Sequence, residues 1–252
     1  MNEDKITEIE QRRTLAGENR KPQPAWAKSN ANIAPNGKMA FRIITIERES
    51  ACGAAVISKK LSDILGWTLW DQLLAQELAD SIRSDMASTK SQAHRTDDRF
   101  CRLAKIFWRG SYERIAPLDN CLLVDAAHMV AIMHRVSERI AREGNAVVVG
   151  RGAPGFFQNR RDTFHVFLYA SREERVRRLI ANGKSEADVD VVEAVDRERA
   201  AFVKHYFGAQ WPTRSFYDLM INTAIGEDNV VSTILHAMLR VEEGRHSTRQ
   251  AS

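Results

Sequence analysis

Short runs of β-branched and aliphatic residues alternate along the chain with stretches in which apolar residues recur every three or four positions. The runs at residues 42–46, 146–149, 164–169 and 218–222 predict buried strands, and residues 67–70 predict a further short strand. Helical spacing predicts helices that end at Gly66 and Gly144, a helix that follows Asp71, and a closing helix through residues 230–238. Ser171-Arg-Glu-Glu174 is a capping box that predicts another helix start. This alternation predicts an α/β fold in three layers, with a mainly parallel sheet between helices.

Three segments depart from the alternation. Residues 1–39 are polar and contain Pro22, Pro24 and Pro35. We expect a disordered N-terminal arm there, because little apolar surface is present to offset the entropy of ordering. Residues 244–252 are similar and predict a disordered tail. Residues 85–125 are polar and then mixed, and they predict a helical insertion within one domain that spans residues 40–243.

Composition narrows the class of protein. Among 252 residues, 44% are apolar, which is enough for a core, and the net charge of +4 is mild. This charge suits a small anionic ligand and is too weak to indicate nucleic acid. Cys52, Cys101 and Cys121 form no C-x-x-C pair, which indicates a reducing compartment. Since the chain has no run of 18 apolar residues and no signal peptide, we expect a cytoplasmic protein with no membrane partner.

The loop after the first predicted strand reads Glu47-Arg-Glu-Ser-Ala-Cys-Gly-Ala-Ala55 and leads into a helix. Small residues at such a junction let backbone N–H groups turn towards an anion, and the helix start adds its positive dipole end. The motif G-x-x-x-x-G-K-[ST] is incomplete, because Arg48 replaces its first glycine, Ala54 its lysine and Ala55 its Ser/Thr. Two interpretations remain at this point: a phosphate loop without its lysine, or a tight turn that binds nothing. The candidate phosphate-binding residues are Arg48, Ser50, Ala51, Cys52, Gly53, Ala54 and Ala55.

Four segments match one known family in order and spacing. They are Ile44-Thr-Ile-Glu-Arg-Glu49; Ala146-Val-Val-Val-Gly-Arg-Gly-Ala153; His165-Val-Phe-Leu-Tyr-Ala170 with Glu174, Arg175 and Arg178; and Asp196-Arg-Glu-Arg199 with Trp211 and Tyr217-Asp-Leu-Met-Ile-Asn-Thr223. Over residues 41–240 the chain resembles the cytidylate kinase-like family, a divergent branch of the bacterial cytidylate kinases. In that branch the loop already lacks its lysine and carries an arginine where this chain has Ala55.

The resemblance implies a P-loop nucleoside monophosphate kinase fold. Residues 85–125 would then be the monophosphate-binding part, and residues 181–191 would form a small lid. The implied activity is transfer of a phosphoryl group from ATP to CMP or dCMP, with Mg²⁺. The kinase fold and the activity are implied by the resemblance to the family, whereas periodicity by itself indicates only the alternation of strands and helices.

Matching positions suggest catalytic residues. Arg151 corresponds to an arginine at the acceptor site of cytidylate kinases, although an ion pair that pins the turn would look the same. Asp196 and Arg199 lie three apart, hence on one helix face, and match a pair that serves the acceptor nucleotide. An exposed salt bridge is the alternative for them. Gly152 stands where cytidylate kinases have an aspartate, which weakens the indication of cytosine as the base.

Other positions are candidates for donor and metal binding. Arg175 and Arg178 share a helix face and would reach the donor phosphates or adenine, unless they form only a charged helix surface. Arg48 would replace part of the missing lysine's charge, and Glu47 would bind the metal. Cys52 is expected simply as a small residue that fits the loop.

Three functions remain open from the sequence. The first is a nucleotide kinase for a pyrimidine monophosphate, and the second is a nucleotide-binding protein without transfer activity. The third is a P-loop kinase for another small acceptor. In each case the expected partner is a small molecule and not a nucleic acid. The sequence leaves the oligomeric state open.

Overall fold

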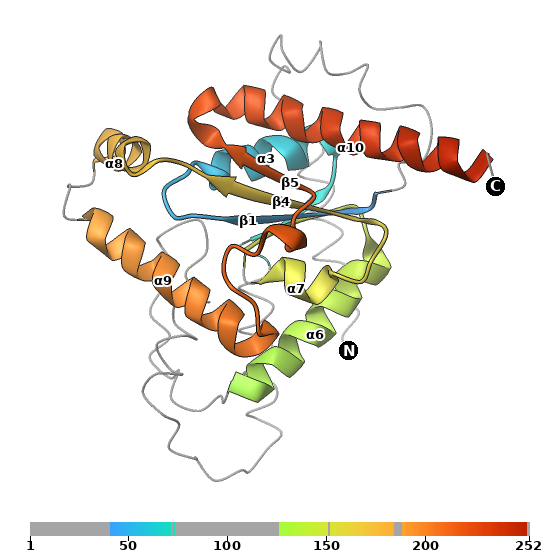
Figure 1. Ribbon diagram of the computed structural model, residues 1–252, viewed down its shortest axis with the longest axis horizontal. Coiled ribbons are helices and arrows are strands. Elements are labelled where there is room, and N and C mark those ends of the chain that lie inside the picture. The colour runs from blue at the N-terminus through green and yellow to red at the C-terminus, as the bar shows by residue number, and fades with distance from the viewer. Residues whose placement is uncertain (1–40, 72, 74–125, 151, 184–187, 251–252) are drawn as a thin grey trace, which may run out of the picture. The chain divides into compact units, whose positions relative to one another are not determined.

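The computed structural model describes residues 41–71, 73, 126–150, 152–183 and 188–250 (Figure 1). Contacts between residues divide the chain into Met1–Asn36 and Gly37–Ser252, and every described residue belongs to the second unit. The predicted arm at residues 1–39, the predicted insertion at 85–125 and nearly all of the helix expected after Asp71 lie outside the described residues.

A five-stranded parallel sheet lies at the centre of this unit, in the order β2-β3-β1-β4-β5. The strands are β1 (Ile43–Arg48), β2 (Thr68–Trp70), β3 (Ala146–Val149), β4 (Thr163–Tyr169) and β5 (Leu219–Asn222). All five match strands predicted from the sequence. Because the strands are parallel, their carboxyl ends share one edge of the sheet, and the loops that follow β1, β3 and β4 lie close together there.

Helices cover both faces of the sheet (Figure 1). They are α3 (Ala54–Leu65), α6 (Ala126–Glu143), α7 (Ala153–Phe157), α8 (Arg172–Ala181), α9 (Asp188–Phe207) and α10 (Glu227–Gln250). α3 and α10 pack together over one face, and α6, α7 and α9 lie against the other. Short 3₁₀ turns, η3 (Arg214–Phe216) and η4 (Thr223–Ile225), flank β5. The predicted three-layer α/β architecture is confirmed.

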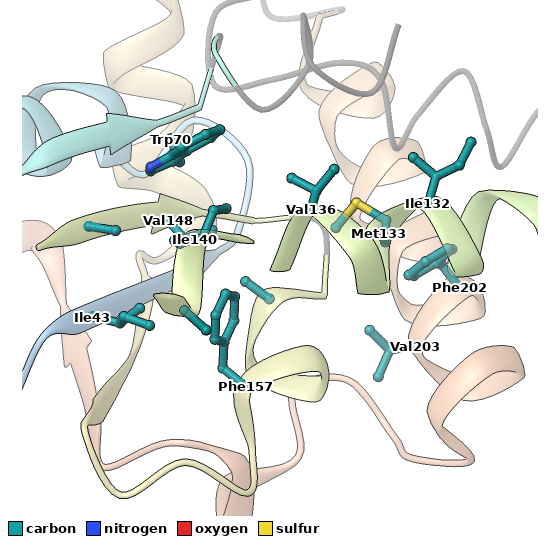
Figure 2. Packing of buried hydrophobic residues seen from close by; sticks show 13 residues of the cluster. Ile43, Trp70, Ile132, Met133, Val136, Ile140, Val148, Phe157, Phe202 and Val203 are labelled. Atoms are coloured by element: carbon teal, nitrogen blue, oxygen red, sulfur yellow. The ribbon is translucent and has the colours of Figure 1, made fainter. Parts of the chain in front are cut away.

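A hydrophobic cluster fixes α9 beneath the sheet (Figure 2). Its buried members from the sheet are Ile43, Trp70, Ala146 and Val148, and those from the helices are Ile132, Met133, Val136, Ile140, Ala141, Ala153, Phe157, Phe202 and Val203. Side chains on a strand alternate between faces, so Glu47, four residues after Ile43, lies on the same face as this cluster. Burial of Phe202 and Val203 holds the C-terminal part of α9 in place, and this positions Arg199 and Asp196, about one and two turns earlier on that helix.

The first strand is longer than predicted. Its pairing with β4 continues through Glu47 with Phe167 and Arg48 with Leu168. Glu47 and Arg48 are therefore strand residues, and the loop comprises residues 49–53 instead of 47–55. α7 was not predicted from the sequence, although Pro154 in its first turn is a recognised sign of a helix start.

Two other segments differ from expectation. α10 continues to Gln250, so residues 244–250 extend a helix, where a disordered tail was predicted. Buried Glu242 anchors this end of α10 by accepting a hydrogen bond from the backbone N–H of Phe41 at 2.9 Å. In the predicted lid, α8 ends at Ala181 and α9 begins at Asp188, while residues 184–187 lie outside the described part. No helix in the described ranges is long and apolar enough to cross a membrane.

Candidate functional site

The loop at residues 49–53 connects the carboxyl end of β1 to the start of α3. Ala51 and Gly53 adopt left-handed backbone conformations, with φ angles of 61° and 84°. Gly53 precedes the first turn of α3, and no side chain caps that helix start. Turned N–H groups and the positive end of a helix dipole both favour an anion. The loop therefore has the backbone features of an anion site, although it lacks the lysine.

Ser50 has all of its polar groups bound by α8 and α9. Its N–H donates to both carboxylate oxygens of Asp196, at 3.0 and 3.2 Å, and its hydroxyl donates to Asp196 Oδ1 at 2.9 Å. Its carbonyl oxygen accepts from Arg175 Nε at 2.8 Å. The Ser50 hydroxyl also accepts from Arg199 Nη1 at 2.7 Å. Two helices far along the chain thus hold the first part of the loop.

The Asp196 carboxylate lies buried between two guanidinium groups. Arg175 Nη2 is 2.6 Å from Oδ2, and Arg199 Nη1 is 2.9 Å from Oδ1. Charge-assisted hydrogen bonds of this kind compensate for the removal of the carboxylate from water. Asp196 and Arg199 share one helix face as predicted, and that face meets the loop, so an exposed surface salt bridge does not describe them.

Arg199 is held beside the loop through a single nitrogen. Besides Ser50 and Asp196, Nη1 donates to the carbonyl oxygen of Arg48 at 3.3 Å. Nε and Nη2 form no hydrogen bond with any residue that the structure describes. Burial, followed by the nearby charge of Arg48, lowers the pKa of Arg199 to about 10. The guanidinium therefore remains positively charged at neutral pH.

Arg178 contacts the loop from α8 at another point. Its Nη1 donates to the carbonyl oxygen of Cys52 and, at 3.0 Å, to Thr223 Oγ1, while Nη2 donates to the carbonyl oxygen of Thr223 at 2.8 Å. Glu174 Oε1 accepts from Nε at 2.7 Å. A Cβ at Gly53 would lie 2.7 Å from Arg178 Nη1, so this close approach requires glycine. Arg178 therefore contacts the loop itself, and its predicted contact with donor phosphates or adenine stays a prediction.

Glu47 and Arg48 are buried at the end of β1, with 3% and 4% of their surface exposed. Glu47 Oε1 accepts from the N–H of Arg48 at 3.3 Å, and Oε2 accepts from the N–H of Gly152 at 3.2 Å. Arg48 Nη1 lies 3.7 Å from Glu47 Oε1. The Arg48 guanidinium passes over Gly150, where a Cβ would lie only 1.8 Å from Nη1. Glu47 therefore acts as an internal acceptor that joins β1 to the turn after β3.

Magnesium in nucleotide sites takes hard oxygen ligands, usually one or two from the protein and the rest from phosphates and water. Ala55 offers no hydroxyl, and both oxygens of Glu47 already accept backbone hydrogen bonds. Within the described ranges, no group of three or more His, Cys, Asp or Glu residues could hold a metal ion. Each carboxylate oxygen of Glu47 keeps a second lone pair, so Glu47 stays the predicted protein ligand for an ion that would otherwise be held by phosphate oxygens and water.

Burial changes the chemistry of two loop residues. It raises the pKa of Glu49, whose carboxylate accepts from the N–H of Ala170 at 3.2 Å and lies 4.0 Å from Arg175 Nη1. It also raises the pKa of Cys52 to about 11, so the thiol is protonated at neutral pH. Cys52 is a buried residue, which agrees with its expected role as a small residue that fits.

The structure thus brings five of the predicted residues together around one loop. They are Arg48, Arg175, Arg178, Asp196 and Arg199. Arg151 lies outside the described residues. Sequence reasoning missed Glu174 as a partner of Arg178, although the spacing of four residues on one helix was a usable signal. Asn222, the last residue of β5, caps the start of η4 by accepting from the N–H of Ala224 at 3.0 Å.

Comparison with known proteins identifies the family. The sequence profile of the cytidylate kinase-like family matches residues 43–225. The chain belongs to this family. A search of curated proteins found no match. This match confirms the resemblance seen in four sequence segments.

Three solved structures are similar to this chain at low sequence identity. A crystal structure of an uncharacterized protein from Eubacterium ventriosum is 18% identical, with a TM-score of 0.54, and the match covers 78% of this chain and 97% of that chain. Shikimate kinase from Acinetobacter baumannii is 13% identical, with a TM-score of 0.44 and coverage of 86% and 98%. A gluconokinase from Sinorhizobium meliloti is 13% identical, with a TM-score of 0.46 and coverage of 84% and 99%.

Proposed function

We propose that this member of the cytidylate kinase-like family binds ATP at residues 49–53 and the start of α3, and transfers a phosphoryl group to a pyrimidine nucleoside monophosphate such as CMP or dCMP. The observation that carries the proposal is the position of Arg199. Its guanidinium is buried beside the loop, and Nε and Nη2 have no hydrogen-bond partner among the described residues. These two nitrogens form one edge of the planar fork that matches phosphate oxygens.

Charge supports the same role. Phosphoryl transfer depends on positive groups near the migrating phosphoryl group. Arg199 has a pKa of about 10 despite its burial, so it is positively charged at neutral pH and could bind a phosphate through Nε and Nη2. In this chain Arg199 would therefore supply charge that a phosphate-loop lysine at position 54 supplies elsewhere.

ATP would provide the phosphoryl group, and the residues of this chain would bind and orient it. The turned backbone of the loop favours the donor phosphates, and Arg178, which is also bound to Glu174 and Thr223, holds the loop at Cys52. The family match supports a pyrimidine monophosphate as acceptor, with Arg151 proposed to bind its phosphate. Magnesium would accompany ATP, and Glu47 is proposed as its ligand from the protein.

A kinase assay with a matched pair of variants tests this proposal. Release of ADP is measured with Mg-ATP and each common nucleoside monophosphate for the wild type, Arg199→Ala and Arg197→Ala. Arg197 is an exposed arginine of the same helix and serves as the control. Because Arg199 would stabilise transferring charge, we expect its loss to lower kcat/KM for CMP by about 10²–10³ and Arg197→Ala to leave it unchanged. Equal activity of the wild type and Arg199→Ala would contradict the role of Arg199.

A second function, nucleotide binding without transfer, is favoured by the residues at two positions. Ala54 and Ala55 carry neither the lysine charge nor the metal-holding hydroxyl. Calorimetric titration with ATP and ADP separates this function from the first. Binding without turnover on any acceptor would establish it, and turnover on an acceptor other than CMP or dCMP would identify a different kinase. Absence of both binding and turnover would overturn the nucleotide proposal.

A further inference from the structure

The contacts of Ser50 join the loop to the pair of helices α8 and α9. Asp196 receives hydrogen bonds from the N–H and the hydroxyl of Ser50, in the way that a loop N–H would meet a bound anion. Arg175 binds the same carboxylate through Nη2 and the Ser50 carbonyl oxygen through Nε. One residue of the loop is thereby bonded to three side chains from two helices.

We propose that Arg175 and Asp196 are positioning residues for the donor site: they hold the loop at Ser50, so that α8 and α9 set the affinity for ATP. This inference rests on the proposed function. It assigns Asp196 to the loop that binds the donor, whereas the family resemblance suggested that Asp196 serves the acceptor nucleotide. Neither residue is required to touch a nucleotide.

Saturation of the Asp196 carboxylate supports this assignment. Oδ1 accepts from the N–H and the hydroxyl of Ser50 and from Arg199 Nη1, and Oδ2 accepts from the same N–H and from Arg175 Nη2. An ionised carboxylate offers about four lone-pair sites. Asp196 therefore has little capacity left to accept hydrogen bonds from a hydroxyl or the nucleobase of the acceptor nucleotide. Its contacts are those of an anion that stabilises the protein internally.

The geometry also explains why the loop needs external support. Ala51 has a positive φ without being glycine, a conformation that persists only when the surroundings impose it. Ser50 is the residue directly before Ala51, so its contacts to Asp196 and Arg175 fix the chain where this conformation begins. Loss of these contacts would let the loop relax and its N–H groups turn away from the donor phosphates.

Binding measurements on variants test the proposal. Because Asp196→Asn removes the negative charge while keeping the side chain's shape, we expect it to weaken ATP binding at least about tenfold and to leave CMP binding unchanged. The control is Arg172→Ala, which breaks an exposed bridge between α8 and α9, 3.2 Å from Arg172 Nε to Glu193 Oε1, that does not reach the loop. It should change neither affinity. Weakened CMP binding with unchanged ATP binding would overturn the proposal in favour of an acceptor role.

A double-mutant cycle separates loop positioning from general helix packing. Ser50→Ala and Asp196→Asn should be non-additive for ATP affinity, because one removes the hydroxyl donor and the other the anionic acceptor of the same hydrogen bond. Ser50→Ala and Arg172→Ala should be additive. Additivity in the first pair, or an equal loss of ATP affinity in Arg172→Ala, would refute positioning through Ser50.

The reactivity of Cys52 provides a readout that needs no nucleotide. Its buried thiol can be alkylated only when the loop opens, and peptide mass spectrometry distinguishes it from the other cysteines. We expect alkylation of Cys52 to be at least about tenfold faster in Arg175→Gln and Asp196→Asn than in the wild type or Arg172→Ala, at urea concentrations where circular dichroism shows no global unfolding. Unchanged alkylation would overturn the inference. If the wild type binds no ATP, the proposed function fails while alkylation still tests the loop contact.

Discussion

For individual residues, burial and hydrogen bonding act in opposite directions on the ionisable groups around the loop. Burial favours the uncharged form, and it raises the pKa of Cys52 to about 11 and that of Glu49 above its usual range. Hydrogen bonds from Arg177, then from Arg178, favour the charged form of Glu174 and lower its pKa to about 2. Glu174 therefore remains a fixed anion that orients Arg178 over the whole physiological range of pH.

The buried thiol predicts a dependence of stability on pH. The pKa of Cys52 is raised from 9.0 to about 11, so the folded state holds a proton that the unfolded chain releases. The contribution of the protonated Cys52 thiol to the unfolding free energy is complete below about pH 9 and is lost as the pH rises through about 11. We expect the wild type to lose up to about 3 kcal/mol more unfolding free energy than Cys52→Ala between about pH 8 and pH 11. Urea unfolding of both proteins measures this difference; parallel pH curves would contradict it.

For the elements, the ends of β1 and β3 fit together because glycine leaves room for an arginine. Gly150 follows β3 with a φ of 67°, and Arg48 Nη1 lies where its Cβ would project. Gly66, at the end of α3, has a φ of 66° and nothing within 4 Å of the corresponding position. The two glycines share a backbone conformation and differ in the space around them.

This difference predicts unequal effects of alanine. Gly66→Ala should lower the unfolding free energy by about 1–2 kcal/mol, the cost of a left-handed non-glycine residue. Gly150→Ala carries the same cost and also displaces Arg48. It should therefore lower the unfolding free energy by about 1–3 kcal/mol more than Gly66→Ala does. Urea denaturation compares the two variants. Equal destabilisation would mean that the Arg48 side chain moves aside without strain.

For the whole molecule, contacts between distant parts of the chain hold the layers in register. Glu242 of α10 is buried and accepts a hydrogen bond from the N–H of Phe41, two residues before β1 and 201 residues away in sequence. Lys60 of α3 pairs with Asp228 of α10 at 2.7 Å between more exposed atoms. The last helix is therefore attached both to the start of the central strand and to α3.

The buried hydrogen bond of Glu242 predicts a larger effect on stability than the exposed ion pair of the neighbouring Glu243. Glu242→Ala leaves the Phe41 N–H buried without this acceptor, and it should lower the unfolding free energy by about 1–3 kcal/mol. Glu243→Ala removes an exposed pair with Arg240, whose side chains are 64% and 82% exposed, and should cost less than about 0.5 kcal/mol. Chemical denaturation with circular dichroism measures both. Similar small losses in the two variants would show that Glu242 is dispensable.

The sequence by itself determined the five strands, the helices that end at Gly66 and Gly144, the α/β class and the family. Hydrophobic period and helix-capping residues are local properties, so they can be read without knowing what packs against them. The same signals did not reveal that β1 reaches Arg48, because this depends on pairing with Leu168 of β4.

Only the tertiary structure decided which charges meet the loop. Arg175, Arg178 and Arg199 were candidates from spacing and family match, but spacing does not distinguish a helix face turned to solvent from one turned to Ser50. Asp196 is 146 residues from Ser50, and the two meet because Phe202 and Val203 bury α9 beneath the sheet. Non-local burial orients that helix, and the orientation then determines which charges surround the loop.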